Sequence, residues 1–228
     1  MDDLFELRFY VAKPHMFAIF RNQWMTVHLP IYSDYHDVLG LFEVLRSEPH
    51  PESGETSAGI GLFLRHDDRA AVDRSMNELI KSNRMNEVPG PPGRDLVDHW
   101  ERTFLYPLAQ AESDEPADTH DTETVFELRS WLTTDDGLGP LTDEADRLLA
   151  GLTREHQTER LFASHPEHAE MPDGIAALIR HPDLSAAMTQ SDAQVIAELR
   201  DIAGPALAGY VSGGRRLMLR PLPNSPMS

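Results

Sequence analysis

Apolar and polar positions alternate along two segments near the start of the chain, which is the pattern of a β-strand with one buried face. Residues 4–11 have an apolar face and a second, more polar face that consists of Glu6, Arg8 and Tyr10. Residues 24–32, with the sequence WMTVHLPIY, have an apolar face and a second face that consists of Trp24, Thr26, His28 and Pro30. A strand face that meets only solvent has no need of a tryptophan and a histidine, so this second face is a candidate site.

Two more strands and two helices are predicted in the first half of the chain. Short strands are predicted at residues 17–20 and 59–65. Apolar residues recur at helical spacing in residues 33–47 and again in residues 67–84, a segment that begins with two aspartates, either of which can cap a helix. The two helices are predicted to cover one face of the sheet.

The second half of the chain is predicted to be mostly helical. Residues 112–123 contain six acidic side chains and no large apolar one, which is typical of a solvated linker or an exposed loop. Helices are predicted at residues 142–152, 173–182 and 191–204 from apolar spacing and capping residues. A final strand is predicted at residues 215–220, and the pattern leaves open whether it joins the sheet.

These elements predict an α+β fold, with a mainly antiparallel sheet that is covered on one face by two helices and followed by a mostly helical C-terminal part. The predicted sheet domain spans residues 1–111 and ends in a helix at residues 94–106. The acidic linker spans residues 112–123, and the mostly helical part spans residues 124–228. The pattern shows no internal repeat of fixed period.

Composition narrows the possible chemistry. The chain has 228 residues and no cysteine, which excludes disulfides, cysteine nucleophiles and thiolate metal sites. Its net charge of −18 repels phosphate backbones, so we predict no nucleic-acid partner. No stretch is apolar and long enough to cross a membrane, and the start lacks the pattern of a secretion signal, so a cytoplasmic protein without a membrane partner is expected.

The strand face that the helices leave uncovered is the predicted site. By alternation it combines charged, phenolic, imidazole and aromatic side chains, the mixture that ligand pockets use. The residues on this face are Glu6, Arg8, Tyr10, Trp24, Thr26, His28, Phe63 and Arg65.

Each residue type suggests a role in such a pocket. Two arginines, Arg8 and Arg65, can grip an anionic or carbonyl group through paired hydrogen bonds. His28 titrates near neutrality and is the predicted proton carrier, with Tyr10 as its partner. Glu6 would orient or polarise one of these groups. The rings of Trp24 and Phe63 would form the walls.

Two other interpretations of this face remain open. The polar residues can simply be solvated, with cross-strand ion pairs that contribute about 0.2–1 kcal/mol each. The face can also pack on the helical part, with its aromatic residues in the core. In either case, the alternation marks no site.

A histidine cluster is an alternative site. His165 and His168 are three positions apart, as two ligands on one helical turn would be, and His156 lies nearby in sequence. Zinc accepts such ligands. A metal-dependent hydrolase is therefore one alternative, although exposed loop histidines explain the same pattern and the HExxH motif is absent. Motifs for nucleotide cofactors are also absent, so the chain is predicted to use no cofactor and no metal.

The segments AIFRNQWMTVHLPIY (18–32) and LFLRHDDRAAVDRSMNELIKSNRMNEV (62–88) resemble small stand-alone relatives of the elimination domain of lantibiotic dehydratases, the group that includes thiopeptide cyclases. The likeness covers about a quarter of the chain. It implies a cofactor-free enzyme that performs acid/base chemistry on dehydroamino acids in a ribosomal peptide.

The sequence therefore suggests a cofactor-independent tailoring lyase or cyclase that acts on a small molecule or a modified peptide. A non-catalytic protein that binds a peptide or a basic partner is the alternative from another class. The sequence leaves the substrate and the oligomeric state open.

Overall fold

The computed structural model describes residues 3–45, 57–88, 90–91, 93–111, 124–167, 173–223 and 225. The predicted acidic linker and His168 lie outside these residues. Among the described residues, no helix combines the length and the apolar character that crossing a membrane requires.

The first half of the chain alternates strands with short helices. Its elements are β1 (Leu4–Ala12), α1 (Phe17–Gln23), a π-helical turn (Trp24–His28), α2 (Leu29–Ser33), β2 (Asp37–Leu45), β3 (Ser57–His66), α3 (Arg69–Ser82), a 3-10 turn (Arg84–Glu87), α4 (Gly93–Leu96) and β4 (Val97–Gln110).

The second half of the chain repeats this alternation. Its elements are β5 (Val125–Thr133), α5 (Leu138–Asp143), α6 (Ala145–Glu155), β6 (Gln157–Pro166), β7 (Gly174–His181), α7 (Leu184–Ala187), α8 (Asp192–Ala203), a 3-10 turn (Ala208–Tyr210) and β8 (Val211–Pro221).

The strands follow the order of a closed barrel, β1-β3-β2-β8-β5-β7-β6-β4. The expected α+β fold with a mostly helical C-terminal part is therefore wrong. The segment predicted as a helix at 173–182 is strand β7, whose residues Gly174–Ile179 are all buried. A short, continuously apolar run lacks the alternation of a half-buried strand and cannot be told from a buried helix by periodicity.

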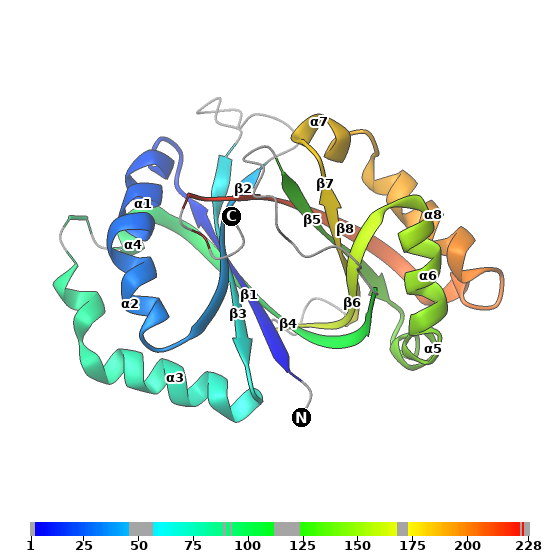
Figure 1. Ribbon diagram of the computed structural model, residues 1–228, viewed down its shortest axis with the longest axis horizontal. Coiled ribbons are helices and arrows are strands. Elements are labelled where there is room, and N and C mark those ends of the chain that lie inside the picture. Colours follow the sequence, from blue (N-terminus) through cyan, green and yellow to red (C-terminus); the bar gives the residue numbers. More distant parts are fainter. Residues whose placement is uncertain are drawn as a thin grey trace. The chain divides into compact units, whose positions relative to one another are not determined.

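The chain divides into two compact units. One comprises residues 1–102 and 220–228, and the other comprises residues 103–219. In the first unit, α1 and α3 contact β3, and α2 contacts β2 (Figure 1). In the second unit, α6 and α8 pack together, and α6 lies along β6 (Figure 1).

The predicted strand at residues 24–32 is helical. Phe17, Phe20, Trp24, His28 and Ile31 are all buried, and their spacing of three or four residues is that of a helix face. The same segment also alternates in polarity, so both periods fit the sequence. Packing of the helical face against the sheet decides between them.

The helices predicted at residues 33–47 and 94–106 are also wrong, because these segments contain β2 and most of β4. Strand β2 is buried on both faces, which replaces alternation with a nearly continuous apolar run. The strands predicted at residues 4–11, 59–65 and 215–220 are confirmed as β1, β3 and β8.

The helix-covered face of the first sheet is the opposite of the one expected. The β1–β3 register pairs Glu6 with Leu64 and Arg8 with Leu62, and residues directly opposite one another share a face. Leu62 and Leu64 belong to the core cluster that also contains residues of α1, α2 and α3. The face with Glu6, Arg8 and Tyr10 is therefore covered by helices.

The two units contain the same local sequence. Phe-Glu-Leu-Arg occurs in β1 at residues 5–8 and in β5 at residues 126–129. Arg-His ends β3 at residues 65–66 and β7 at residues 180–181. The distance from the glutamate to the histidine is 60 residues in the first unit and 54 in the second. This difference of six residues conceals the repeat from a search for a fixed period.

Strand register supports the repeat. Leu4 pairs with His66 in the first unit, and Val125 pairs with His181 in the second. At the start of the second strand of each pair, a glycine lies against the backbone of the first strand. A Cβ atom on Gly59 would lie 1.9 Å from the Tyr10 carbonyl oxygen, so no larger residue fits. Gly174 has the same relation, at 2.2 Å, to the carbonyl oxygen of Trp131.

Of the adjacent aspartates Asp67 and Asp68, the second caps helix α3. The Asp68 carboxylate accepts a hydrogen bond from the backbone N–H of Ala71 at 2.7 Å and so caps α3. We expect Asp68→Ala to lower the free energy of unfolding by about 1 kcal/mol, because this N–H loses its partner. Asp67→Ala is the matched control and should change it by less than about 0.5 kcal/mol. Urea unfolding of both variants measures the difference, and equal effects would contradict the assignment of the cap.

Candidate active site in the first unit

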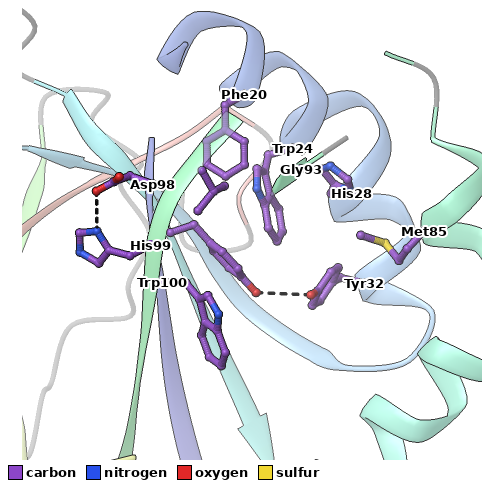
Figure 2. A pocket seen from close by; sticks show the side chains of 11 residues that line it. Phe20, Trp24, His28, Tyr32, Met85, Gly93, Asp98, His99 and Trp100 are labelled. Carbon is purple, nitrogen blue, oxygen red and sulfur yellow. Dashed lines mark hydrogen bonds and ion pairs between the residues drawn. The ribbon is translucent and has the colours of Figure 1, made fainter. Parts of the chain in front are cut away.

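A cavity of about 400 Å³ lies in the first unit, beside the helical segment 17–33 and strands β1 and β4. Most of its wall is aromatic, with a few polar groups (Figure 2). A mainly apolar pocket with few convergent polar groups is the usual form of a small-molecule site. The lining residues are Tyr10, Phe20, Trp24, His28, Tyr32, Met85, Gly93, Val97, Asp98, His99 and Trp100.

A π-helical turn supplies two of these side chains. The backbone N–H of Leu29 donates to the carbonyl oxygen of Trp24, five residues earlier, which widens the helix at this point. Trp24 and His28 lie on the same side of the turn, with ring centroids 5.1 Å apart. Pro30 has no N–H to donate and sits in the first turn of α2. Such turns occur frequently at functional sites.

The aromatic rings form a packed wall. The ring of Tyr10 lies 5.2 Å from that of Trp24 and 6.5 Å from that of Trp100. Trp24 also lies 5.2 Å from Tyr32. Trp24 and Tyr32 are buried, whereas Trp100 is 46% exposed and marks the open side of the cavity. A flat aromatic ligand can stack on such surfaces.

His28 is the lining residue best suited to accept a proton. Its Nδ1 atom is buried without a hydrogen-bond partner among the described residues. Burial lowers the pKa of His28 below its ordinary value of 6.5. The imidazole is therefore neutral at pH 7, which is the protonation state that a general base requires.

Two groups at the rim form a second polar pair. The Nδ1 atom of His99 lies 2.9 Å from a carboxylate oxygen of Asp98, and both side chains are largely exposed. Figure 2 shows this pair on the opposite side of the site from His28. The pair is solvated, so its charges are partly screened.

A buried ionic cluster lies next to the cavity. Arg8 donates two hydrogen bonds to the carboxylate of Glu6, and the Nε2 atom of His66 lies 2.9 Å from the same carboxylate. Arg102 lies 3.5 Å from it. These partners lower the pKa of Glu6 to about 2, although burial alone would raise it. Arg8 is only 2% exposed, so it is a fixed cation in a dry environment.

Acid should destabilise the protein through this cluster. The pKa of Glu6 is lower in the folded chain than its ordinary value of 4.5, so its contribution is complete above about pH 4.5 and is lost as the pH falls toward about 2. We expect a loss on the order of 3 kcal/mol from this group between about pH 5 and pH 2. Urea unfolding across this range measures it, and constant stability would contradict the assignment.

The structure brings together only part of the set predicted from sequence. Tyr10, Trp24 and His28 line the cavity, and Glu6 and Arg8 lie next to it on the same strand face. Arg65 is exposed and pairs with Asp37 at 2.7 Å. Phe63 stacks on Phe5 with ring centroids 5.6 Å apart. These two residues belong to the other face, because residue 63 lies opposite residue 7 rather than residue 6 or 8.

Sequence reasoning missed Tyr32 and the four residues of β4 that line the cavity, Val97, Asp98, His99 and Trp100. The spacing of Trp24, His28 and Tyr32 could have revealed Tyr32, because residues four positions apart lie on one face of a helix. This signal is visible only if the segment is treated as a helix. The β4 residues come from a segment predicted as a helix, and nothing in their spacing connects them to residues 10–32.

The histidine cluster is not a metal site among the described residues, where no group of three metal-ligating side chains occurs. His156 directly precedes strand β6 and His165 lies near the end of this strand, which separates them by roughly 30 Å. His156 instead lies beside Glu198, and His165 lies 3.0 Å from Asp173. The alternative of a metal-dependent hydrolase at these histidines therefore has no structural support.

No known protein family matches the sequence, and no curated protein is recognisably similar to it. Among solved structures, an anthrone oxidase-like protein is similar, with a TM-score of 0.58 and 11% identity over 99% of this chain and 94% of that one. A protein named as a monooxygenase from Fusobacterium nucleatum has a TM-score of 0.56 and 8% identity over 97% and 93% of the two chains. A mutant chlorite dismutase from Candidatus Nitrospira defluvii has a TM-score of 0.50 and 7% identity over 96% and 92%.

These similarities show the fold and correct the expected family. The chain has the fold of the monooxygenase-like and chlorite dismutase-like proteins, so the resemblance to lantibiotic dehydratase elimination domains is wrong. The lyase or cyclase activity that the resemblance implied loses its support with it. Of its two segments, 18–32 is helical instead of the expected strands, whereas 62–88 contains a strand followed by a helix, as expected.

Proposed function

We propose that the protein binds a planar aromatic small molecule in the cavity of the first unit and oxidises it with molecular oxygen. The single observation that supports the binding step is the cavity itself, with Tyr10, Trp24, Tyr32 and Trp100 around a space of about 400 Å³. The choice of reaction is supported by the fold, which the chain shares with an anthrone oxidase-like protein and a monooxygenase.

The proposed reaction begins with proton removal from the substrate. The neutral imidazole of His28 takes a proton from an acidic C–H or O–H bond of the aromatic molecule, which leaves an electron-rich anion. In an anthrone, molecular oxygen then converts the CH₂ group to a carbonyl. One oxygen atom remains in the new carbonyl, and the other leaves as water with the two hydrogen atoms of that carbon. Oxygen is the only oxidant that this balance requires.

The remaining residues bind and shield the substrate. The rings of Trp24 and Trp100 provide surfaces for stacking, and the buried ring of Phe20 excludes water from one end. Exclusion of water prevents early quenching of the anion and strengthens polar contacts inside the cavity. Glu6 positions Arg8 beside the site and does not itself line the cavity.

Anthrone itself tests the proposal. We expect the purified protein to bind it with quenching of tryptophan fluorescence and to consume one molecule of oxygen for each molecule oxidised, faster than the reaction in buffer alone. Trp24→Ala should weaken binding, because it removes the central ring of the wall. Ile80→Ala is the matched control, since Ile80 is 66% exposed on α3 and does not line the cavity. Binding without oxygen uptake would contradict the oxidation step, and no binding would contradict the site.

A further inference from the structure

Two phenol hydroxyls face each other at the wall of the cavity. The oxygen atoms of Tyr10 and Tyr32 are 3.4 Å apart, whereas a normal O–H···O hydrogen bond has a length of about 2.7–2.8 Å. Figure 2 shows the Tyr32 hydroxyl directed along this contact. A third oxygen placed beside the pair can therefore lie at normal hydrogen-bond distance from both hydroxyls.

Arg8 leaves the phenol proton of Tyr10 available. Its guanidinium carbon lies 5.9 Å from the centre of the Tyr32 ring, and it also interacts with Tyr10. Arginine can only donate, so its hydrogen bond to Tyr10 uses an oxygen lone pair of the phenol and leaves the phenol proton free. Burial raises the pKa of Tyr10 well above 10, so this residue remains a neutral donor.

We propose that Tyr10 and Tyr32 together bind the ionised oxygen of a phenol or an enol, with Arg8 as the fixed positive charge behind them. The inference rests on the proposed function and deepens it, because it names the substrate class as aromatic molecules with an ionisable hydroxyl. On binding, the O–H bond of the ligand breaks and an N–H bond forms on His28, with no change in oxidation state.

Other charged groups near the pair do not cancel this effect. The Glu6 carboxylate is shared, because it accepts hydrogen bonds from Arg8, lies 3.5 Å from Arg102 and also lies against His66, so its negative charge is not opposed to Arg8 alone. His36 stacks on Tyr32 and has its pKa lowered to about 4, so it is neutral. At the rim, the carboxylate of Asp98 is held by His99 and is exposed to solvent. Arg8 is therefore the buried charge that acts on the hydroxyl pair from the side of β1.

A pair of nearly identical probes tests this inference independently of oxidation. 4-Nitrophenol has an ionisable hydroxyl whose anion absorbs visible light, and 4-nitroanisole has the same ring with a methyl ether. At a pH one unit below the pKa of free 4-nitrophenol, we expect binding to the wild-type protein to increase the anion absorbance. Tyr10→Phe and Tyr32→Phe should each weaken binding of 4-nitrophenol by about tenfold to a hundredfold, because a charge-assisted hydrogen bond is lost.

The affinity for 4-nitroanisole should be the same in all three proteins within about twofold, because the ether has no anion to stabilise. Circular dichroism checks that each variant is folded. If bound 4-nitrophenol remains protonated in the wild-type protein, the inference is wrong even if anthrone is oxidised. If the two Phe variants weaken both probes equally, the hydroxyls act on packing alone and the inference is also wrong. Failure of both probes to bind the wild-type protein would instead contradict the proposed cavity.

Discussion

Replacement of Trp131 by alanine is expected to lower the free energy of unfolding by about 3–5 kcal/mol, the range for removal of a large aromatic side chain from a core. Trp131 is fully buried in the core cluster of the second unit, and its indole N–H donates to the carbonyl oxygen of Val195 at 3.1 Å. The variant loses this packing and the hydrogen bond from the indole N–H. Urea unfolding followed by far-ultraviolet circular dichroism measures the loss.

Tyr10 is the natural control for Trp131, because the two residues occupy equivalent positions. Each lies four positions after the glutamate of the repeated Phe-Glu-Leu-Arg motif and against the matching glycine, Gly59 or Gly174. Tyr10 already borders a cavity and is partly exposed, so Tyr10→Ala should cost less than half as much. Equal losses of stability would contradict the conclusion that Trp131 is packed in a core, whereas Tyr10 borders a cavity.

Replacement of His28 by alanine is expected to reduce anthrone oxidation by about 10²- to 10⁴-fold, which is the usual contribution of a general base. The physical reason is that His28 is the buried, neutral imidazole that lines the cavity. The wild-type rate should fall as the pH decreases through a pKa that is lower than 6.5, since protonation removes the lone pair. Initial rates of oxygen uptake between about pH 5 and pH 8 give both results.

His36→Gln is the matched control for the His28 variant. His36 is as deeply buried as His28 but does not line the cavity. Its replacement should leave the oxidation rate within about threefold of the wild-type value and leave the acidic limb of the pH profile in place. A rate for His28→Ala close to that of the wild type would remove His28 from the proposed mechanism, whatever the effect on binding.

The ionic cluster beside the site has a counterpart in the second unit. Glu6 and Glu127 occupy equivalent positions, and each lies against an arginine and a histidine of its own unit. In the second unit the arginine also contacts Glu198 of α8 and Gln190 of the loop before this helix. The ionic cluster is therefore repeated in both units, and in the first unit it lies beside the aromatic cavity.

The sequence by itself determined the elements whose pattern of apolar and polar residues fits only one type of secondary structure. Strand β1 and the helix α8, with its capping box of Ser191 and Gln194, follow directly from alternation and capping chemistry. The sequence also placed Tyr10, Trp24 and His28 in one candidate set, because their residue types are costly to leave on a solvated strand.

Only the tertiary structure decided where those side chains meet. Residues 24–32 fit both the period of a strand and the period of a helix, and burial of Trp24, His28 and Tyr32 against the sheet selects the helix. Strands that are buried on both faces, such as β2 and β7, lose the alternation that identifies a strand. The β4 side of the cavity comes from about 70 residues further along the chain, and a contact over that separation is set by packing, which local patterns do not encode.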